Sequence, residues 1–229
     1  MKYLSNKNSC CFSLRLIILS FFYINISIAQ DINMEWRFHV HMNKSLCQMA
    51  IWIADEQGRY VDTVYVTRKV AIKGLGNKGG GIDARSDGSR LSALPVWAHH
   101  RGEDYGGGNY YPPKGQPLID AITSATPWAG EFVWIWKPTS RLKSGRYFYF
   151  IEVNKSYDSN EYHDYSWYRG QPSVVWKGEI VVGDDEYTSS AKIIGHGEVA
   201  GEDGSINPDV STLTSALKLI DRARVVYRP

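Results

Sequence analysis

The feature that most constrains the fold is a strict alternation of apolar and polar side chains in an early segment. In the run EWRFHVHM at residues 35 to 42, every second side chain is large and apolar, namely Trp36, Phe38, Val40 and Met42. A period of two is typical of a β-strand that has one face in a core and the other in water. The chain must therefore form a sheet whose apolar face is covered by another layer.

Further short runs have strand-like composition: 47–54, 60–67, 131–137, 146–153, 178–182, 192–195 and 224–227. The first two flank the polar sequence DEQG, and the next two flank a turn near Ser144 and Gly145, so we expect two β-hairpins. Residues 209 to 220 predict one short C-terminal helix. Many short strands with a single helix predict an all-β sandwich. Residues 68–94 and 101–117, rich in Gly and polar residues, are expected to be long loops, with a short apolar segment at 94–97 between them.

The N-terminal 29 residues have the three parts of a secretory signal peptide. A basic start (Lys2, Lys7 and Arg15) precedes an apolar run that ends before the small residue Ala29. An uncleaved membrane anchor is the alternative, but the apolar run is shorter than the ~20 residues that span a bilayer. We therefore predict a signal peptide over 1–29 and one sandwich domain over 30–229. The protein would be periplasmic or secreted, with no stable membrane insertion after cleavage.

Composition limits the partners. The chain of 229 residues has 26 basic and 24 acidic side chains, and the predicted signal removes three basic ones, which leaves 23 against 24. A nucleic-acid binder needs a basic surface, so we expect no nucleic-acid partner.

Cys47 is the one cysteine beyond the signal. It is either a redox thiol or, as its apolar neighbours favour, a small buried residue.

One short motif suggests a cofactor. Residues 120–127 read DAITSATP, which resembles the target motif of extracytoplasmic flavin transferases. The resemblance implies covalent FMN, joined through its phosphate to the hydroxyl of Thr126, with Asp120 and Thr123 shaping the acceptor turn. Ser124 stands where the motif usually has glycine. The alternative is a plain turn in which Asp120 closes a loop before the next strand.

A wider resemblance includes the same motif. The segments YVDTVYVTR (60–68), LPVWAH (94–99), DAITSATP (120–127) and GRYFYFIE (145–152) follow one another in an order that resembles the predicted periplasmic family known as domain of unknown function 2271. The resemblance covers about residues 35 to 227 and implies an immunoglobulin-like β-sandwich. It also implies an accessory or electron-transfer role, with a flavin transferase and a membrane redox partner, rather than a stand-alone enzyme.

Two further groups of side chains could bind ligands. In the polar, aromatic insertion at 154–176, four rings could stack on sugars or contact a protein: Tyr162, Tyr165, Trp167 and Tyr168. That would make the chain a non-enzymatic binding module, although the same rings could simply hold the insertion on the sandwich.

His39 and His41 lie on one face of a strand, about 7 Å apart, which suits two ligands of one metal ion. They are equally typical of a wet strand face, and no hydrolase motif accompanies them.

Overall fold

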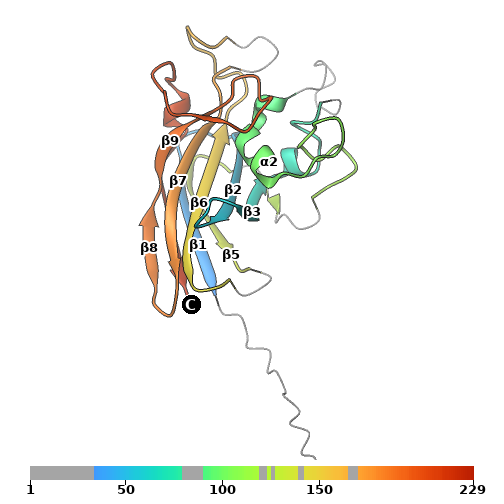
Figure 1. Ribbon diagram of the computed structural model, residues 1–229. Coiled ribbons are helices and arrows are strands. Elements are labelled where there is room, and N and C mark those ends of the chain that lie inside the picture. Colours follow the sequence, from blue (N-terminus) through green and yellow to red (C-terminus); the bar gives the residue numbers. More distant parts are fainter. Residues whose placement is uncertain (1–33, 79–89, 119–122, 125–126, 139–141, 165–169) are drawn as a thin grey trace, which may run out of the picture. The chain divides into compact units, whose positions relative to one another are not determined.

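The alternating run forms the strand β1 (Glu35–Met42) of a computed structural model (Figure 1). The structure describes residues 34–78, 90–118, 123–124, 127–138, 142–164 and 170–229. All of these lie in one compact unit, Ile32–Pro229, so the predicted signal peptide falls outside the described residues. The four apolar side chains of β1 are fully buried and the intervening ones are partly exposed, as the alternation predicts.

Two sheets form the fold. The smaller sheet has the strand order β5-β1-β11-β8, in which β5 is Gly130–Trp136, β11 is Ile220–Arg228 and β8 is Tyr187–Ser190. The larger has the order β10-β9-β7-β6-β2-β3-β4. Its strands are β2 (Gln48–Asp55), β3 (Tyr60–Thr67), β4 (Thr123–Ser124), β6 (Gly145–Asn154), β7 (Val174–Val182), β9 (Lys192–Gly197) and β10 (Ile206–Asn207). Every pairing is antiparallel except that of β3 with β4.

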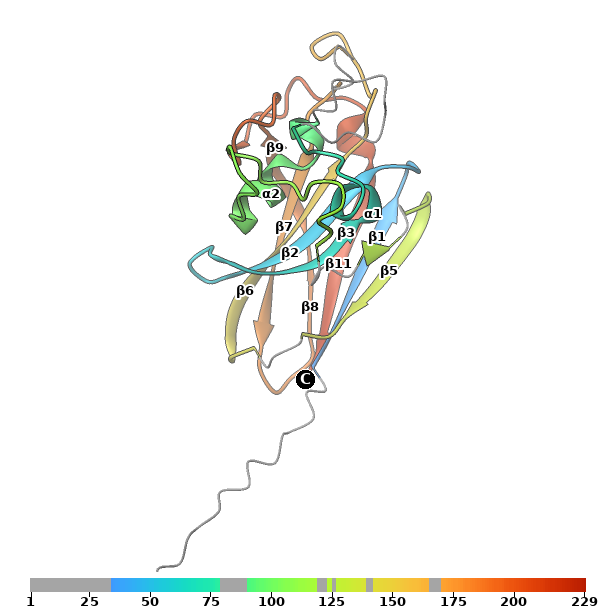
Figure 2. The ribbon, with the colours of Figure 1, turned by 90° about the vertical axis from the view of Figure 1, so that its right-hand side faces the viewer.

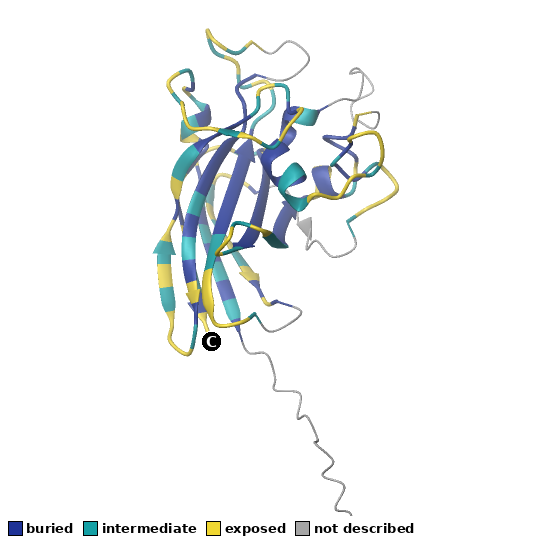
Figure 3. Cartoon of the chain, in the orientation of Figure 1, coloured by how far each residue is buried: buried dark blue, intermediate teal, exposed yellow. Residues whose placement is uncertain are grey.

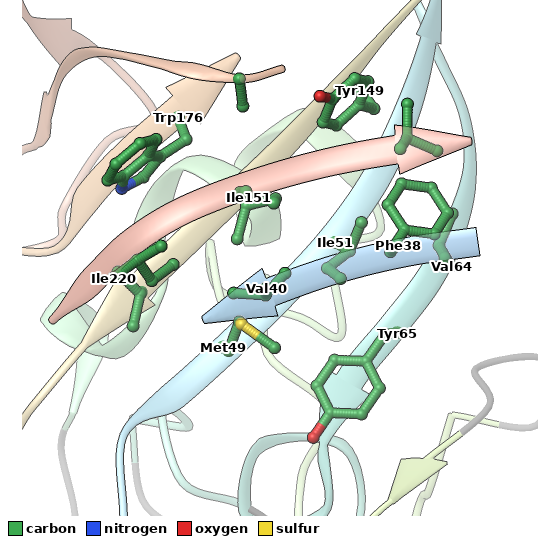
Figure 4. Packing of buried hydrophobic residues seen from close by; sticks show 14 of the residues in the cluster. Phe38, Val40, Met49, Ile51, Val64, Tyr65, Tyr149, Ile151, Trp176 and Ile220 are labelled. Carbon is green, nitrogen blue, oxygen red and sulfur yellow. The ribbon is translucent and has the colours of Figure 1, made fainter. Parts of the chain in front are cut away.

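Apolar side chains from both sheets fill the space between them. Phe38 and Val40 of the smaller sheet meet Met49, Ile51 and Ile151 of the larger one (Figure 4). Each fully buried side chain of this size stabilises the fold by roughly 1.5–3 kcal/mol. Together with the sheet topology, this core confirms the predicted all-β sandwich. We call it the inner core.

One of the two predicted hairpins is confirmed. Strands β2 and β3 pair directly, and their turn is closed by the Gly58 N–H, which donates to the Asp55 carbonyl over 2.9 Å. Gly58 has φ = 80°, a left-handed conformation that glycine adopts without strain. The sequence DEQG therefore forms the hairpin turn that its composition predicts.

The second predicted hairpin is wrong. Strand β5 pairs with β1 in the smaller sheet, whereas β6 pairs with β2 and β7 in the larger one. The chain after Trp136 thus crosses from one sheet to the other instead of turning back on itself. Alternation shows which face of β5 is buried, but it carries no information about which strand lies beside it.

The helical segments are short and mostly not where the sequence pattern places them. They are α1 (Arg68–Ala71), η1 (Leu91–Ala93), α2 (Pro95–Arg101) and η3 (Ala216–Lys218). The predicted C-terminal helix is the single 3-10 turn η3. The apolar segment at 94–97 belongs instead to α2, which has Pro95 in its first turn and ends at Gly102, with φ = 74°. No described helix has the length and hydropathy to cross a membrane.

Candidate functional site

The larger sheet is covered on both faces. Its outward face packs against residues 68–78 and 90–118, which we call the outer layer; Figures 1 and 2 show α2 lying across β2 and β3. Trp52 and Phe150 of the sheet are buried together with Trp97 and Tyr111 of the outer layer. In Figure 3 the central strands of the sheet are accordingly dark blue on this side. The segments predicted to be loops therefore form a second apolar core.

Helix α2 is attached to the sheet by a buried carboxylate. Glu152, in β6, is fully buried. It accepts hydrogen bonds from the backbone N–H of Val96 at 3.2 Å, from that of Trp97 at 2.7 Å and from the hydroxyl of Ser173 at 2.6 Å. Burial raises the pKa of Glu152 to about 7, and the hydrogen bonds from Ser173 and the two amides oppose that rise. Since α2 has no capping side chain of its own, Glu152 satisfies the free N–H groups of its first turn.

Two further contacts fix the side chains of α2. The Trp97 indole donates to the hydroxyl oxygen of Thr63 at 3.0 Å. The Trp52 indole donates to Nδ1 of His100 at 2.8 Å, which leaves Nε2 of that ring to donate to the Gly58 carbonyl at 2.7 Å. The helix thus joins the hairpin turn, β2 and β3.

Arg101 ends the helix and is largely enclosed by its neighbours. Its side chain is 6% exposed and forms an ion pair with Glu103. The guanidinium donates to the Tyr105 hydroxyl at 3.2 Å and to the Tyr110 carbonyl at 3.1 Å. It also lies 5.3 Å from the centre of the Trp97 ring and 5.4 Å from that of Tyr105. Within the described residues, its buried Nε atom has no hydrogen-bond partner.

A cleft of about 780 Å³ opens between β3 and the outer layer. Its walls are residues 60–63 of β3, residues 115–118, and Arg101, Glu103 and Tyr105. Burial raises the pKa of Tyr60 to about 12 and also raises the pKa of Tyr105. Both phenols therefore keep their protons at neutral pH. The cleft offers two aromatic rings, two acidic side chains, one paired arginine and the amide of Gln116.

The structure describes only part of the predicted flavin motif. Thr123 lies in β4, where its backbone pairs with Val66 of β3, while Asp120 and Thr126 lie outside the described residues. Strand β4 is the outermost strand of the larger sheet on that side. The chain enters the motif from Leu118, which lines the cleft.

Of the aromatic residues predicted to bind sugars, Tyr162 is described and is 59% exposed. Tyr165, Trp167 and Tyr168 lie outside the described residues. The nearby part of the insertion is held by side-chain contacts to the C-terminal loop, such as that from Asn160 to the Thr212 carbonyl at 2.8 Å. The described part of the insertion therefore rests on that loop, and Tyr162 projects from it.

The two histidines predicted as weak metal candidates lie on the outward face of the smaller sheet. His39 Nδ1 is 3.4 Å from a carboxylate oxygen of Glu131, and His41 Nδ1 is 3.9 Å from one of Asp221. Among the described residues, no cluster of three His, Cys, Asp or Glu side chains is arranged to hold a metal ion. The pair has a carboxylate neighbour on each ring and no third ligand in this part of the chain.

Cys47 is fully buried immediately before β2. Burial raises the pKa of its thiol to about 11. A thiolate is the reactive form of cysteine, so this residue acts as a packing residue rather than a redox group.

The cleft residues are those that sequence patterns miss. Arg101, Glu103, Tyr105 and Gln116 all belong to a segment whose glycines and prolines indicate only a loop. The available signal was the mixture of aromatic and charged residues at 101–105, which is unusual for a solvated loop.

Comparison with protein-family models found no matching family, and comparisons with curated proteins and with solved structures found no significant match.

Proposed function

We propose that this chain is an exported, non-enzymatic binding protein whose cleft between β3 and the outer layer holds a neutral, hydroxyl-rich ligand, namely a carbohydrate. The observation that carries the proposal is the cleft of about 780 Å³ with Arg101 enclosed in its wall. Its volume is within the range of small-molecule sites, and it combines aromatic surfaces with a few placed polar groups.

The charges of the cleft favour a neutral ligand over an anion. Arg101 is already paired with Glu103, and Asp62 adds a second carboxylate to the wall. An anionic ligand would meet more negative than positive charge. Sugar hydroxyls, in contrast, both donate and accept, so they can bond to carboxylates, to the Gln116 amide and to phenol groups at once.

The aromatic residues favour a sugar ring in particular. Tyr60 and Tyr105 line the cleft, each with a polar hydroxyl at its tip. The Tyr60 hydroxyl lies 2.6 Å from that of Thr63, and the Tyr105 hydroxyl accepts from Arg101. These contacts fix the rings in place before any ligand arrives, which reduces the entropic cost of binding.

Isothermal titration against neutral oligosaccharides, chosen from a glycan array, tests this proposal. Tyr105→Ala should weaken binding roughly tenfold or more, whereas Tyr105→Phe, which keeps the ring, should lose less. Tyr162→Ala is the matched control, because it removes an exposed tyrosine outside the cleft. If Tyr105→Ala kept wild-type affinity while Tyr162→Ala lost affinity, the sugar would bind at the insertion and not in the cleft. Absence of binding to every glycan on the array would overturn the carbohydrate proposal.

A second candidate function is the flavin role. We propose it because β4, which contains Thr123, is an outermost strand with β3 as its one neighbour in the described sheet. A motif at a sheet border is accessible to a modifying enzyme without unfolding of the core. FMN on Thr126 would make the chain an accessory or electron-transfer protein between a flavin transferase system and a membrane redox partner.

Coexpression with a flavin transferase tests the second candidate. The intact mass should rise by one phosphodiester-linked FMN, and flavin fluorescence should stay with the chain after denaturation. Thr126→Ala should abolish both signals, and Thr188→Ala serves as the control, because it removes a threonine of β8 outside the motif. An unchanged mass in the wild-type protein would remove this candidate and leave the cleft proposal intact.

A further inference from the structure

Strand β5 is an unusually open sheet edge. It forms one border of the smaller sheet, with β1 as its neighbour in the described structure (Figure 2). Its outward-facing Val133 and Ile135 are each 46% exposed. The seven residues of the strand, GEFVWIW, contain neither proline nor lysine. A long, apolar edge of this kind presents unpaired backbone groups that another strand can use.

The other sheet borders differ from β5. Strand β8 has four residues with alternating exposure, and β4 and β10 have two residues each. Very short edge strands are a common way to prevent edge-to-edge association. Among the sheet borders that the structure describes, three therefore have this protection, and β5 lacks it.

We propose that β5 pairs antiparallel with β5 of a second copy of this chain, about a two-fold axis at Trp134. In this register Val133 faces Ile135 of the partner subunit, and Glu131 faces Lys137 of the partner subunit. The two four-stranded sheets then join into one continuous sheet across the axis. Such a contact is isologous, the arrangement of most homodimers.

The register follows from the outward face of β5. Residues that face each other across an antiparallel pair project from the same side of the sheet, so exposed residues must meet exposed residues. Glu131, Val133, Ile135 and Lys137 are all exposed. A shift of two residues along one strand would place Glu131 against Ile135 of the partner subunit, or Lys137 against Val133 of the partner subunit. Only the register about Trp134 matches charge with opposite charge and apolar with apolar.

The charged residues at the two ends make only exposed ion pairs within the chain. Lys137 is 61% exposed and its Nζ lies 3.9 Å from Glu35, while the Glu131 carboxylate is 42% exposed and lies 3.5 Å from Arg222 and 3.4 Å from His39. Exposed pairs of this kind are weak, so neither holds its partner tightly. Glu131 and Lys137 carry opposite charges at the two ends of the strand, so the strand is complementary to a second copy of itself. This favours a second copy over an unrelated peptide at this edge.

Sedimentation equilibrium of the purified protein over a concentration series tests the dimer by charge reversal. Wild type should form a reversible dimer. Glu131→Lys alone, or Lys137→Glu alone, should weaken it roughly tenfold, because each substitution places two like-charged pairs in the two-fold contact. The double variant Glu131→Lys with Lys137→Glu should restore wild-type association. A monomeric wild type, or a double variant that associates no better than the single ones, would overturn the proposal.

Cysteine cross-linking tests the register independently. Val133→Cys with Ile135→Cys should give a disulfide-linked dimer under mild oxidation, since these two positions face each other. Val133→Cys alone should cross-link much less. Val181→Cys, at an exposed site on β7 of the other sheet, is the matched control. Efficient cross-linking through Val181, or equal yields from the single and double variants of β5, would contradict the register.

Discussion

The two apolar cores of this molecule are stabilised by different kinds of interaction. In the inner core most side chains come from regular strands, and aromatic rings pack edge to face, as Trp36 does on Trp136 with centres 5.6 Å apart. The outer layer has an irregular backbone, and buried polar groups attach it. Glu152 is one such group, and the Asn154 amide, also in β6, donates to the Ser92 carbonyl at 3.0 Å. Within the layer itself, the Tyr111 hydroxyl accepts from the Leu94 N–H at 2.8 Å and donates to the Leu91 carbonyl at 2.6 Å.

The difference follows from what each backbone needs. Strands satisfy their own N–H and C=O groups in the sheet, so the inner core can rely on non-directional apolar burial. A covering layer made of short helical turns leaves backbone groups unpaired, and each buried one must find a partner. The polar attachments that meet this need also fix the wall of the cleft. The ordered wall of the cleft is thus a consequence of covering a sheet with irregular chain.

The largest effect is expected from removing an inner-core anchor. Trp36 is fully buried among the rings of Phe38, Trp136, Tyr147 and Tyr227. Trp36→Ala should lower the free energy of unfolding by roughly 3–5 kcal/mol, because it leaves a large cavity between the sheets. Urea denaturation monitored by circular dichroism measures this loss.

Trp128→Ala provides the control for that measurement. Trp128 is 76% exposed, so its removal should change the free energy of unfolding by less than about 0.5 kcal/mol. Equal losses in the two variants would show that burial in the inner core does not govern stability.

A smaller and more local effect is expected from the outer layer. Glu152→Ala removes the acceptor for two backbone N–H groups of α2 and for the Ser173 hydroxyl. At pH 6 the free energy of unfolding should fall by roughly 3 kcal/mol, since buried donors without partners are costly. Hydrogen exchange should accelerate in residues 95–101 and stay slow in β1. Uniform acceleration in both regions would mean that the two cores do not behave as separate layers.

The same carboxyl should make the outer layer sensitive to pH. Burial raises the folded-state pKa of Glu152 from its ordinary value of 4.5 to about 7. A raised pKa means that the folded state holds a proton which the unfolded chain releases. The stabilisation of the folded state by this proton is therefore complete below about pH 4.5. It is lost as the pH rises through about 7, with an amplitude on the order of 3 kcal/mol.

Glu152→Gln isolates this contribution, because the amide does not titrate in this range. The difference in unfolding free energy between wild type and the variant should change between pH 4.5 and pH 8, with wild type relatively less stable at the higher pH. Parallel pH profiles for the two proteins would show that Glu152 does not carry the effect.

Sequence patterns predicted the inner core well and the outer layer poorly. The alternation of β1 and the apolar run of β2 match the observed strands within a residue, because a period of two directly records which side chains are buried. The partner of β5 could not be predicted, since strand pairing depends on where the whole chain crosses between sheets. Segment 101–117 is irregular chain after the end of α2, as its composition predicts, but its packing depends on contacts outside the segment, such as the hydrogen bond from the Tyr111 hydroxyl to the Leu91 carbonyl at 2.6 Å.

The cleft could not be predicted from the sequence for a similar reason. Tyr60, Asp62 and Thr63 lay in a predicted strand, but nothing local indicated that Arg101 would close a cleft against them. The cleft joins positions about forty residues apart, and Glu152, from a third segment, helps to fix helix α2 beside them. Short motifs can name candidate chemistry, but a cleft built by three segments is a property of the fold.

Apart from the Trp128 control, the smallest effect is expected on the wet face of β1, which belongs to neither core. His39 and His41 have only exposed or partly exposed carboxylate neighbours, Glu131 and Asp221. The double variant His39→Ala with His41→Ala should change the free energy of unfolding by less than about 1 kcal/mol, because such pairs are weak. Urea denaturation gives this value, and elemental analysis of protein purified without a histidine tag should show the same metal content before and after the substitution. A loss comparable to that of Glu152→Ala, or bound metal that disappears with the histidines, would assign this face a structural or ligand-binding role that its exposure argues against.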